Sequence, residues 1–531
     1  MKAALLEATV AHVHERLEGA EAADVERFVR AYYEHVAPED LLGRSDLDLY
    51  CAALTHLNLA RVRRRGELKT RIYTPNAEEH GWESTHTVVE TVTEDMPFLV
   101  DSVSMAVTRQ GSAIHLVVRP IMRMKRDDAG RLLEVEADDG LAESLIHVEI
   151  DRRTDPAAVE GLRTDLNRAL ADVEAAVQDW PAMRERAVEI SAALAETPPP
   201  VEPEELAEAR DLLQWMHHDH FTFLGYREYD MVVEDGEDVL RAVPNSGLGI
   251  LRDSGEAGQR STSSSFAQLP PEVRKLAREK TLLNLTKANS RATVHRPSYL
   301  DYVGVKRFDA SGEVAGERRF LGLYTHTAYS ASPWEIPVLR RKVRRIRERS
   351  GLPPGSHDDK ALIEIIETYP RDELFQMSED ELHDIALGIL HLGERRRVRL
   401  FVRRDCFGRF FSCLVYLPRE RFHTDNRRRI EDILQEAFGG VSVDYTSRVS
   451  ESVLARFHFV IFTEPGRVPE YDAAEIEARL AAATRAWTDV LRDALVEQLG
   501  EERAGRLFER YGDAFPGAYR TTSRRARPFS T

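Results

Sequence analysis

THTVVETVTEDMPFLVDSVSMAVTRQG, residues 85–111, changes its pattern of apolar residues from alternation to helical spacing within a few positions. The alternating start predicts a strand, and the remainder predicts a helix over 96–110. We expect Asp95 to cap that helix, Pro97 to stand in its first turn and Gly111 to end it. A strand that leads directly into a helix favours an α+β fold for the surrounding block.

The residues that follow extend this pattern. SAIHLVVRPIMRMKR (112–126) and ESLIHVEIDR (143–152) predict two more strands, separated by an Asp-Ala-Gly turn. Asp155, followed by a proline, then opens a helix that runs to about residue 180. The order strand-helix-strand-strand-helix predicts a ferredoxin-like unit over 85–180, with both helices on one face of an antiparallel sheet.

A second unit of this style is predicted at about 397–465. VRLFVRRD and GRFFSCLVYLP form a hairpin, and VSVDYTSRV and RFHFVIFTE supply two further strands. Between these pairs, TDNRRRIEDILQEAFGG predicts a helix over 424–438. Its spacing predicts nearly complete burial of Ile430, Leu434 and Phe438.

Breaks rich in proline or glycine divide the chain at ETPPPVEP (196–203), SGLPPGSHDD (350–359) and EPGRVPEYD (464–472). The block between the first two contains HFTFLGYREYDMVV, RATVHRP, LDYVGVKRF and ERRFLGLYTH, which read as strands, so we expect a mixed antiparallel sheet there. After the third break we expect one long helix capped by Asp472.

With 531 residues, 42% hydrophobic and 31% charged, the chain has the composition of a globular protein of several domains. No apolar run approaches the roughly 18 residues of a membrane-spanning helix. The formal net charge of −17 argues against nucleic acid or a membrane surface as a partner, because phosphates would be repelled. Three cysteines without metal-type pairing, and an amphipathic start in place of a signal peptide, indicate a cytoplasmic location.

A dense basic run, PVLRRKVRRIRERSG (337–351), contrasts with this acidity. Its apolar residues recur at helical spacing, which predicts a helix with a basic outer face. Such a face could bind an anionic partner. A solvated face that pairs with acidic residues of the same protein is the better interpretation.

Several long, irregular strings carry more information than composition does. The strings are PEDLLGRSDLDLY (38–50), EEHGWESTHTVVE (78–90), EDMPFLVDSV (94–103), HFTFLGYREYD (220–230), LTKANSRATVHRPSYLDYVGVKRFD (285–309), ERRFLGLYTHTAYS (317–330) and ETYPRDELFQ (367–376). In this order they resemble the amino-terminal part of the large bacterial-type NAD-specific glutamate dehydrogenases. The resemblance extends from about residue 30 to about residue 520.

This resemblance implies ACT-like modules and a PAS-like module, then helical motifs, with the catalytic domain later in a chain several times this length. The implied regions are a helical start (1–80), an ACT-like domain (81–198), an antiparallel-sheet, PAS-like domain (204–352), a second ACT-like domain (360–467), the start of a helical motif (470–520) and an irregular tail (521–531). The expected fold class is therefore α+β with several domains and helical ends.

The sequence departs from the family pattern at one turn. ACT modules that bind amino acids place a glycine just after the first strand, where the backbone approaches the ligand. Phe98 stands at that position here. A bulky ring should obstruct the backbone approach, so the resemblance does not predict an amino-acid site at this turn.

Two motifs could suggest a cofactor or a metal. Gly247-Leu248-Gly249 lacks the third glycine of a dinucleotide turn, and Asp253-Ser254-Gly255 follows as another turn, so a plain loop is the better interpretation. A lid or contact loop is the alternative that glycine allows. His217, His218, Asp219 and His220 are all metal-ligand types. Neighbouring side chains point in different directions, however, which favours a polar helix-to-strand corner.

Ser290, His295 and Asp301 have the residue types of a hydrolase triad, but no G-x-S-x-G turn accompanies them. His295, Lys287, Arg291 and Arg296 are better regarded as interface or anion-contacting residues than as parts of a triad, and the leading interpretation of all four is that they are simply polar surface residues.

These observations assign no catalytic, cofactor-binding or metal residue to the chain. The resemblance implies a regulatory and assembly segment, with NAD used only by the full-length enzyme. Expected partners are a downstream catalytic domain and other subunits of a homo-oligomer, with a small-molecule effector left open. One rival is a free-standing amino-acid-sensing ACT-type module, and another is a metal-dependent enzyme that uses residues 217–220. The tail TTSRRARPFST suits a frameshifted or fragment end, or a segment that binds an acidic partner.

Overall fold

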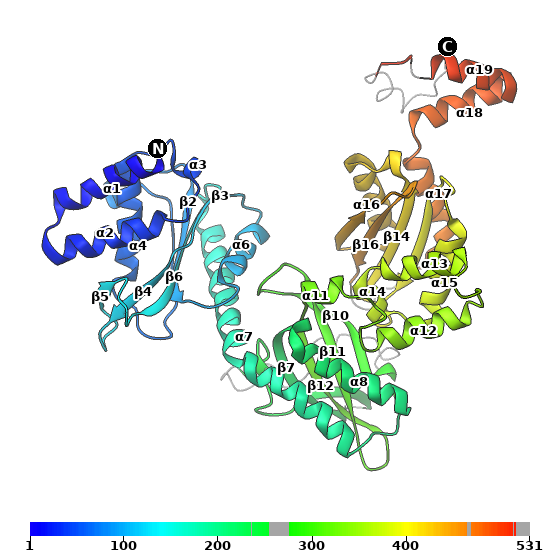
Figure 1. Ribbon diagram of the computed structural model, residues 1–531, viewed down its shortest axis with the longest axis horizontal. Helices are drawn as coiled ribbons and strands as arrows, with labels where there is room; N and C mark the ends of the chain where they lie inside the picture. Colours follow the sequence, from blue (N-terminus) through cyan, green and yellow to red (C-terminus); the bar gives the residue numbers. More distant parts are fainter. Residues whose placement is uncertain (235, 254–274, 465–468, 513, 517–531) are drawn as a thin grey trace.

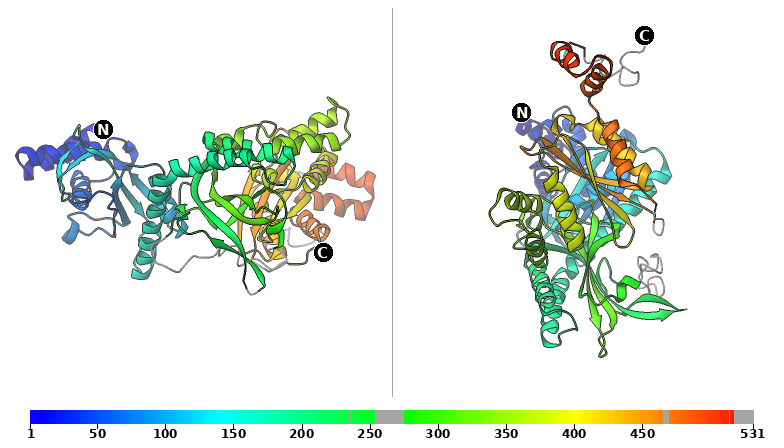
Figure 2. Two further views of the ribbon diagram at one scale, coloured as in Figure 1. Left: turned by 90° about the horizontal axis from the view of Figure 1, so that it is seen from below. Right: turned by 90° about the vertical axis from the view of Figure 1, so that its right-hand side faces the viewer.

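The computed structural model describes residues 1–234, 236–253, 275–464, 469–512 and 514–516. Three antiparallel sheets with packed helices make an α+β protein, as predicted (Figure 1). The first sheet lies at one end of the molecule and the third sheet lies beyond the second (Figure 2). No helix within the described residues is long and apolar enough to cross a membrane. The tail expected at 521–531 lies outside these residues.

Helices α1 (Lys2–Arg16), α2 (Gly19–Tyr33), α3 (Pro38–Leu41) and α4 (Asp46–Ala60) precede the first sheet. The strands of that sheet are β1 (Lys69–Tyr73), β2 (Thr87–Glu94), β3 (Ile114–Val118), β4 (Ile121–Arg126), β5 (Leu132–Val135) and β6 (Leu141–Ile150). Their order is β1-β2-β6-β4-β5. Strand β3 also pairs with β6, on the same edge of β6 as β4. The short helix α5 (Ala77–His80) connects β1 to β2.

Helices α6 (Leu99–Arg109) and α7 (Pro156–Glu196) pack on one face of this sheet, as predicted, through a core that includes Val103, Leu166 and Ile146. The opposite face is covered by α1, α2 and α4, with Phe28 and Leu145 in their shared core. The first unit, β1–β6 with α6 and the N-terminal half of α7, is therefore a sheet between two helical layers.

The predicted start of α6 is wrong. The helix begins at Leu99, and its N-cap residue is Phe98, which lies in the left-handed region with φ 74°. Asp95 does not cap it, because this residue belongs to the preceding sheet edge, where its N–H donates to the Ala142 carbonyl. Gly111, with φ 75°, follows the end of the helix as expected.

Two other predictions in the first unit need correction. The strand predicted over 112–126 is interrupted at Pro120, which has no N–H to donate to the ladder. Helix α7 does not stop near residue 180 but continues through Pro181 to Glu196. Its N-terminal half packs in the core of the first unit, whereas Met183 and Ile190 belong to the core of the second sheet.

The middle sheet consists of β7 (Phe221–Glu234), β8 (Glu237–Ala242), β9 (Leu248–Gly249), β10 (Leu283–Arg291), β11 (Tyr299–Phe308) and β12 (Val314–Tyr324). Its order is β10-β11-β12-β7-β8, with β9 also on β7. Around it lie α8 (Pro203–Trp215), the π-helical turn η1 (Met216–His220), the 3-10 turn η2 (Lys275–Arg278), α11 (His326–Ser330) and α12 (Leu339–Arg349).

The strand predicted for RATVHRP is wrong. Strand β10 ends at Arg291, and residues 292–298 form a loop. His295 in this loop has φ 73°, and the Arg296 N–H donates to the Val294 carbonyl at 3.0 Å, so the backbone turns away from a ladder. We call residues 292–298 the contact loop.

Helices α13 (His357–Glu367), α14 (Arg371–Gln376) and α15 (Glu379–Leu392) precede the third sheet. The second unit then contains β13 (Arg399–Arg404), β14 (Phe410–Pro418), the 3-10 turn η3 (Arg419–Arg421), α16 (Thr424–Phe438), β15 (Ser442–Arg448), β16 (Leu454–Phe462) and α17 (Ala473–Ala483). The strand order is β13-β14-β16-β15. Ile430, Leu434 and Phe438 are at most 1% exposed, which confirms their predicted burial.

The predicted single long helix at the end of the chain is wrong. Asp472 caps α17 as expected, but that helix stops at Ala483 and is followed by α18 (Trp487–Leu499) and α19 (Glu501–Tyr511). The Asp489 carboxylate accepts a hydrogen bond from the Ala486 N–H at 3.1 Å and so begins a new helix at the break.

Candidate functional site

The turn between β2 and α6 lies where an ACT module would place its glycine. Phe98 adopts the positive φ that glycine would adopt there, although a left-handed conformation is unfavourable for a side chain of this size. Such strain persists only where neighbouring structure holds the residue in place. The neighbour here is the contact loop of the middle sheet.

The contact loop covers the N-terminal end of α6. The rings of Phe98 and His295 lie with their centroids 4.9 Å apart, and the His295 N–H donates to the Ser102 Oγ at 3.2 Å. The Arg109 guanidinium donates to the Ala292 carbonyl at 3.0 Å. The turn that could receive a ligand in an ACT module is therefore occupied by a segment of the same chain.

A hydrophobic core lies directly behind this contact. Val103 and Leu166 of the first unit share one cluster of buried residues with Leu224, Leu321 and Leu323 of the middle sheet. Each of these side chains is at most 8% exposed. Because this core has no solvent layer between the two parts, a movement of α6 relative to the middle sheet would require repacking.

A second contact joins the middle sheet to α14. The Lys287 ammonium lies 2.6 Å from the Asp301 carboxylate and 3.1 Å from that of Asp372. Burial would lower the pKa of Lys287, but the two carboxylates outweigh burial and raise it. Burial raises the pKa of Asp301 to about 6, against the opposing effect of Lys287.

A third contact joins the middle sheet to the second unit. The Arg291 guanidinium lies 2.6 Å from the Asp444 carboxylate, and the Tyr299 ring stacks on Phe462 with centroids 3.6 Å apart. Residues Lys287, Arg291 and His295 therefore lie at contacts between regions. Arg296 instead donates to the Tyr324 carbonyl within the middle sheet region, at 2.7 Å.

The triad-like residues have separate partners. His295 faces the first unit, where its Nδ1 lies 3.5 Å from the Asp101 carboxylate. Asp301 pairs with Lys287 and accepts a hydrogen bond from the Tyr324 N–H. Ser290 lies on β10. The structure thus gives His295 and Asp301 structural roles in two different contacts.

Gly247, just before β9, and Gly249 within it pack against neighbouring backbone. A Cβ added to Gly249 would lie 2.1 Å from the Leu224 carbonyl oxygen, and one added to Gly247 would lie 2.2 Å from that of Leu251. The Gly249 N–H donates to the Asp179 carboxylate of α7 at 2.7 Å. An amide that already bonds a carboxylate is not available to a phosphate, so this is a contacting loop. Of the turn noted at 253–255, residues 254 and 255 lie outside the described residues.

The histidines of η1 form a helix-to-strand corner. Ring nitrogens of His217, His218 and His220 each lie within hydrogen-bonding distance of a different backbone carbonyl, on Arg184, Gln214 and Trp215 respectively. The His220 ring also stacks on Trp215. The rings are directed to separate partners and do not converge on one point.

The basic helix α12 pairs with acidic residues of this chain. The sequence analysis favoured this pairing over an anionic partner. Arg340 lies 2.9 Å from the Glu208 carboxylate, and Arg347 lies 2.7 Å from that of Asp359. Lys342 is buried and donates to the Leu374 carbonyl at 2.7 Å. The helix therefore joins α8 to the helices before the second unit.

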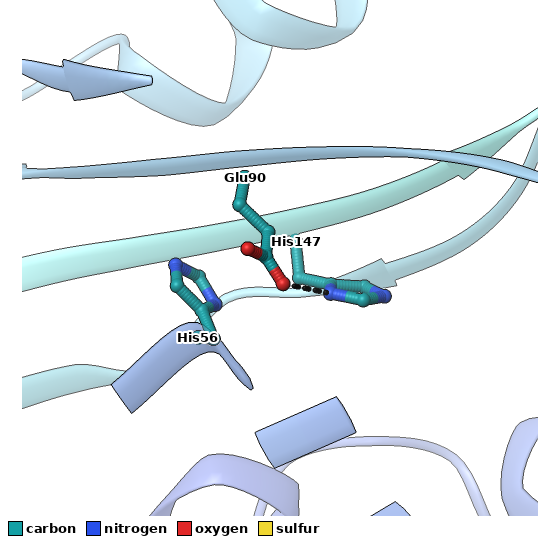
Figure 3. A group of neighbouring side chains, drawn as sticks. All are labelled: His56, Glu90 and His147. Carbon is teal, nitrogen blue, oxygen red and sulfur yellow. Dashed lines mark hydrogen bonds and ion pairs between the residues drawn. The ribbon is translucent and has the colours of Figure 1, made fainter. Parts of the chain in front are cut away.

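The sequence analysis missed one buried polar cluster, formed by His56, Glu90 and His147 (Figure 3). Burial lowers the pKa of His56 to about 4, so this ring is neutral. Burial also disfavours a charged His147, but hydrogen bonds to Glu149 and Glu90 outweigh it and raise its pKa. The sequence signal is weak: it consists of ionisable residues inside strand patterns, Glu90 in TVVETVTE and His147 with Glu149 in LIHVEI.

Four family models match the chain. They are described as glutamate dehydrogenase ACT1 domain (residues 28–166), helical motif 1 (336–395), ACT2 domain (399–488) and helical motif 2 (494–524). The ACT1 and ACT2 matches contain the sheets of the first and second units, and the helical motif 1 match contains α13–α15.

The chain is similar to curated proteins named NAD-specific glutamate dehydrogenase. It is 40% identical to that of Halomonas elongata over 97% of this chain and 32% of the relative. It is 34% identical to that of Pseudomonas aeruginosa over 93% of this chain and 30% of the relative. For Mycobacterium tuberculosis the identity is 30%, over 88% and 28% respectively. The chain thus spans about a third of the length of the curated relatives it matches.

Proposed function

We propose, on the premise that this chain belongs to the family of the NAD-specific glutamate dehydrogenases, that it is a regulatory and assembly segment of such an enzyme. The reaction would be oxidation of L-glutamate to 2-oxoglutarate and ammonia with NAD, performed by a catalytic domain outside these 531 residues. The segment would build contacts between subunits of a homo-oligomer and pass conformational changes to that domain. It would contact neither nucleic acid nor a membrane.

The contact between Phe98 and His295 is the observation that carries this proposal. It places a strained residue of the first unit against a loop of the middle sheet, in front of a core that both regions share. A device that transmits a conformational change needs packed elements that move together. The contact loop, α6 and α7 have that arrangement.

The proposal assigns a module type to each region. The ACT-like modules expected at 81–198 and 360–467 correspond to most of the first and second units, which add β1 before the first module and α17 after the second. The middle sheet at 204–352 is the PAS-like module. The matches to ACT1 and ACT2 models support the first assignment, and the five-strand antiparallel path of the middle sheet is compatible with the second. Because the contact loop covers the ACT1 turn, an effector would bind elsewhere or would have to displace the loop.

Two measurements on the purified 531-residue protein test the proposal. We expect no glutamate-dependent NADH formation above a buffer blank. We also expect calorimetric titration with a panel of amino acids to show no tight, saturable binding. Robust turnover would refute the assignment of catalysis to other sequence, and tight amino-acid binding would favour a free-standing sensor.

A third experiment tests the transmission contact itself. In His295→Ala, hydrogen exchange should accelerate by about tenfold or more, equivalent to about 1.4 kcal/mol, both at the start of α6 and in the contact loop. Thr108→Ala, an exposed change near the other end of α6, is the matched control and should leave both segments unchanged. Faster exchange in the contact loop alone would mean that the two regions are not coupled.

A further inference from the structure

We propose that His56, Glu90 and His147 form a binding site for one divalent transition-metal ion, with Zn²⁺ as the best fit. One ligand atom from each residue lies within 4.8 Å of the other two. The three side chains converge between α4 and the first sheet (Figure 3). Two imidazole nitrogens and one carboxylate oxygen are a ligand set that Zn²⁺ accepts in proteins, usually with a fourth position left for water.

The secondary structure brings these residues together across long sequence separations. Glu90 on β2 and His147 on β6 are directly opposite in the antiparallel register, so their side chains lie on the same face. His56 lies on the buried side of α4, which covers that face. All three residues are at most 2% exposed, so their positions are fixed by surrounding packing.

Outer polar partners face both histidines in the manner of metal ligands: a hydrogen bond for His56 and an ion-pair contact for His147. The His56 Nδ1 lies 2.9 Å from the Tyr32 hydroxyl, and the His147 Nε2 lies 3.6 Å from the Glu149 carboxylate. In metal sites the nitrogen away from the ion usually bonds a carboxylate, a carbonyl or another polar group, which fixes the tautomer. The second nitrogen of His147 faces Glu90, with 3.3 Å between Nδ1 and the carboxylate oxygen.

Without an ion, the His56 Nε2 has the Thr91 carbonyl as its partner at 3.3 Å. Ion binding requires the other tautomer, in which Nδ1–H donates to the Tyr32 hydroxyl oxygen and Nε2 presents its lone pair. The hydroxyl can accept as well as donate, so this change needs no new partner. The three ligand atoms would also have to draw closer, because they are wider apart than the ligands of a bound Zn²⁺.

Charge does not by itself explain the cluster. The Arg71 guanidinium already pairs with Glu90 at 3.0 Å, and Arg44 pairs with Glu149 at 3.0 Å. With these two arginines present, both carboxylates already have a cationic partner. His56 adds a nitrogen ligand to the pair formed by Glu90 and His147.

A cavity of about 420 Å³ borders the cluster at one side. Its wall includes His147, Tyr32, Arg44 and Trp82, so it reaches both a ligand and an outer partner. The Trp82 Nε1–H is buried and has no hydrogen-bond acceptor among the described residues. This donor suits a water molecule held in the cavity.

The test uses metal-stripped 531-residue protein and Co²⁺ or Zn²⁺ alone. We expect one ion per chain and, for Co²⁺, the intense visible absorption of four-coordinate ligation. His56→Gln and His147→Gln should abolish both, and Tyr32→Phe should weaken binding by about 10–100-fold because it removes an outer partner. The double variant His217→Gln/His218→Gln, which alters the histidine group visible in the sequence, is the matched control and should bind normally.

Several results would overturn the proposal. These are the absence of stoichiometric binding, binding that survives in both His56→Gln and His147→Gln, and binding that is lost in the His217/His218 control. If the single variants fail to fold, X-ray absorption of the wild-type complex replaces them. It should show imidazole scattering from two histidines, and a shell made only of water oxygens would also reject the site.

Discussion

The first and second units share the order of four strands, although the first sheet adds β4 and β5, and they use their helical faces differently. In the order β1-β2-β6-β3 and in the order β13-β14-β16-β15, a strand-helix-strand-strand-helix segment follows an antiparallel edge strand. The α6 and α7 face of the first unit shares its core with the middle sheet. The α16 and α17 face of the second unit has a core of its own, which includes Leu434 and Leu480. One topology can thus either share its core with a neighbouring region or form a core of its own, depending on which residues lie on the faces of its helices.

The opposite faces of the two units differ in how they bury charge. In the first unit, Glu143 lies between two arginines, Arg63 and Arg126, and each pairs with it. At the second unit, Arg403 of β13 pairs with Glu373 of the preceding helix α14, and both are nearly fully buried. A carboxylate with one arginine should be more sensitive to loss of its partner than a carboxylate with two.

The largest effect is therefore expected for Arg403→Met. Removal of one partner of a buried pair leaves an uncompensated charge, so the free energy of unfolding should fall by about 3–5 kcal/mol. Arg63→Met should have less than half of this effect, because Arg126 remains 2.6 Å from Glu143. Denaturant unfolding of both variants measures the difference, and equal losses would show that the second arginine does not compensate.

The next effect concerns the cores. Leu434→Ala and Leu166→Ala each remove a fully buried leucine and should destabilise by about 3 kcal/mol. The two variants should loosen different parts of the molecule, because Leu166 lies in the core shared with the middle sheet. Hydrogen exchange should accelerate only in the second unit for Leu434→Ala, but in both α6 and β12 for Leu166→Ala. If exchange in Leu166→Ala accelerated only in the first unit, the two regions would not share a core.

Low pH should reduce the stability of the contact between α14 and the second unit, because it protonates Glu373. Burial raises the pKa of Glu373, but Arg403 beside it outweighs burial and lowers the pKa to about 2, and His458 and Ser412 add smaller effects in the same direction. A lowered folded pKa gives stability that is present above the unfolded value of 4.5 and is lost as the pH falls towards 2. Between pH 7 and pH 3 this group should contribute a loss of about 2 kcal/mol.

Glu373→Gln isolates that contribution. The variant should be less stable at pH 7 and should lose less stability than the wild type between pH 4.5 and pH 3, as measured by urea unfolding at each pH. Parallel pH profiles would mean that other carboxylates account for the acid sensitivity.

The smallest effect is expected at the contact between the middle sheet and the second unit. The Arg291 and Asp444 side chains are both about one-third exposed or more, so solvent weakens their pairing. Arg291→Ala should reduce stability by about 0.2–1 kcal/mol in a denaturant titration. A loss above about 2 kcal/mol would show that this contact, like that of the first unit, holds two regions in one cooperative body.

Periodic sequence segments were predictable, and segments that depend on a distant partner were not. Helix α16 and its buried residues follow directly from spacing and the following glycine. The start of α6 could not be read from Asp95, because a carbonyl on Ala142 determines where that residue bonds. The contact loop resembled a strand in RATVHRP because its apolar residues alternate, but they pack against another unit.

The same distinction applies to the candidate sites. Phe98 was recognisable because it replaces an expected glycine within a single turn. His56, Glu90 and His147 lie on three elements, and their proximity depends on the β2–β6 register and on the position of α4. The histidines at 217–220 could be noticed in the sequence because they are adjacent. In the structure, however, their rings point to separate partners at a helix-to-strand corner.

Helix α7 has a practical consequence for anyone who divides this protein into fragments. Its 41 residues span about 60 Å if straight, and residues from Met183 onward complete the core of the middle sheet rather than that of the first unit. A cut at the proline-rich segment 196–203 looks natural in the sequence but would remove that core layer. A fragment that keeps the middle sheet intact should therefore begin inside the helix, before Pro181, and a fragment of the first unit alone would end with an apolar helix surface exposed to water.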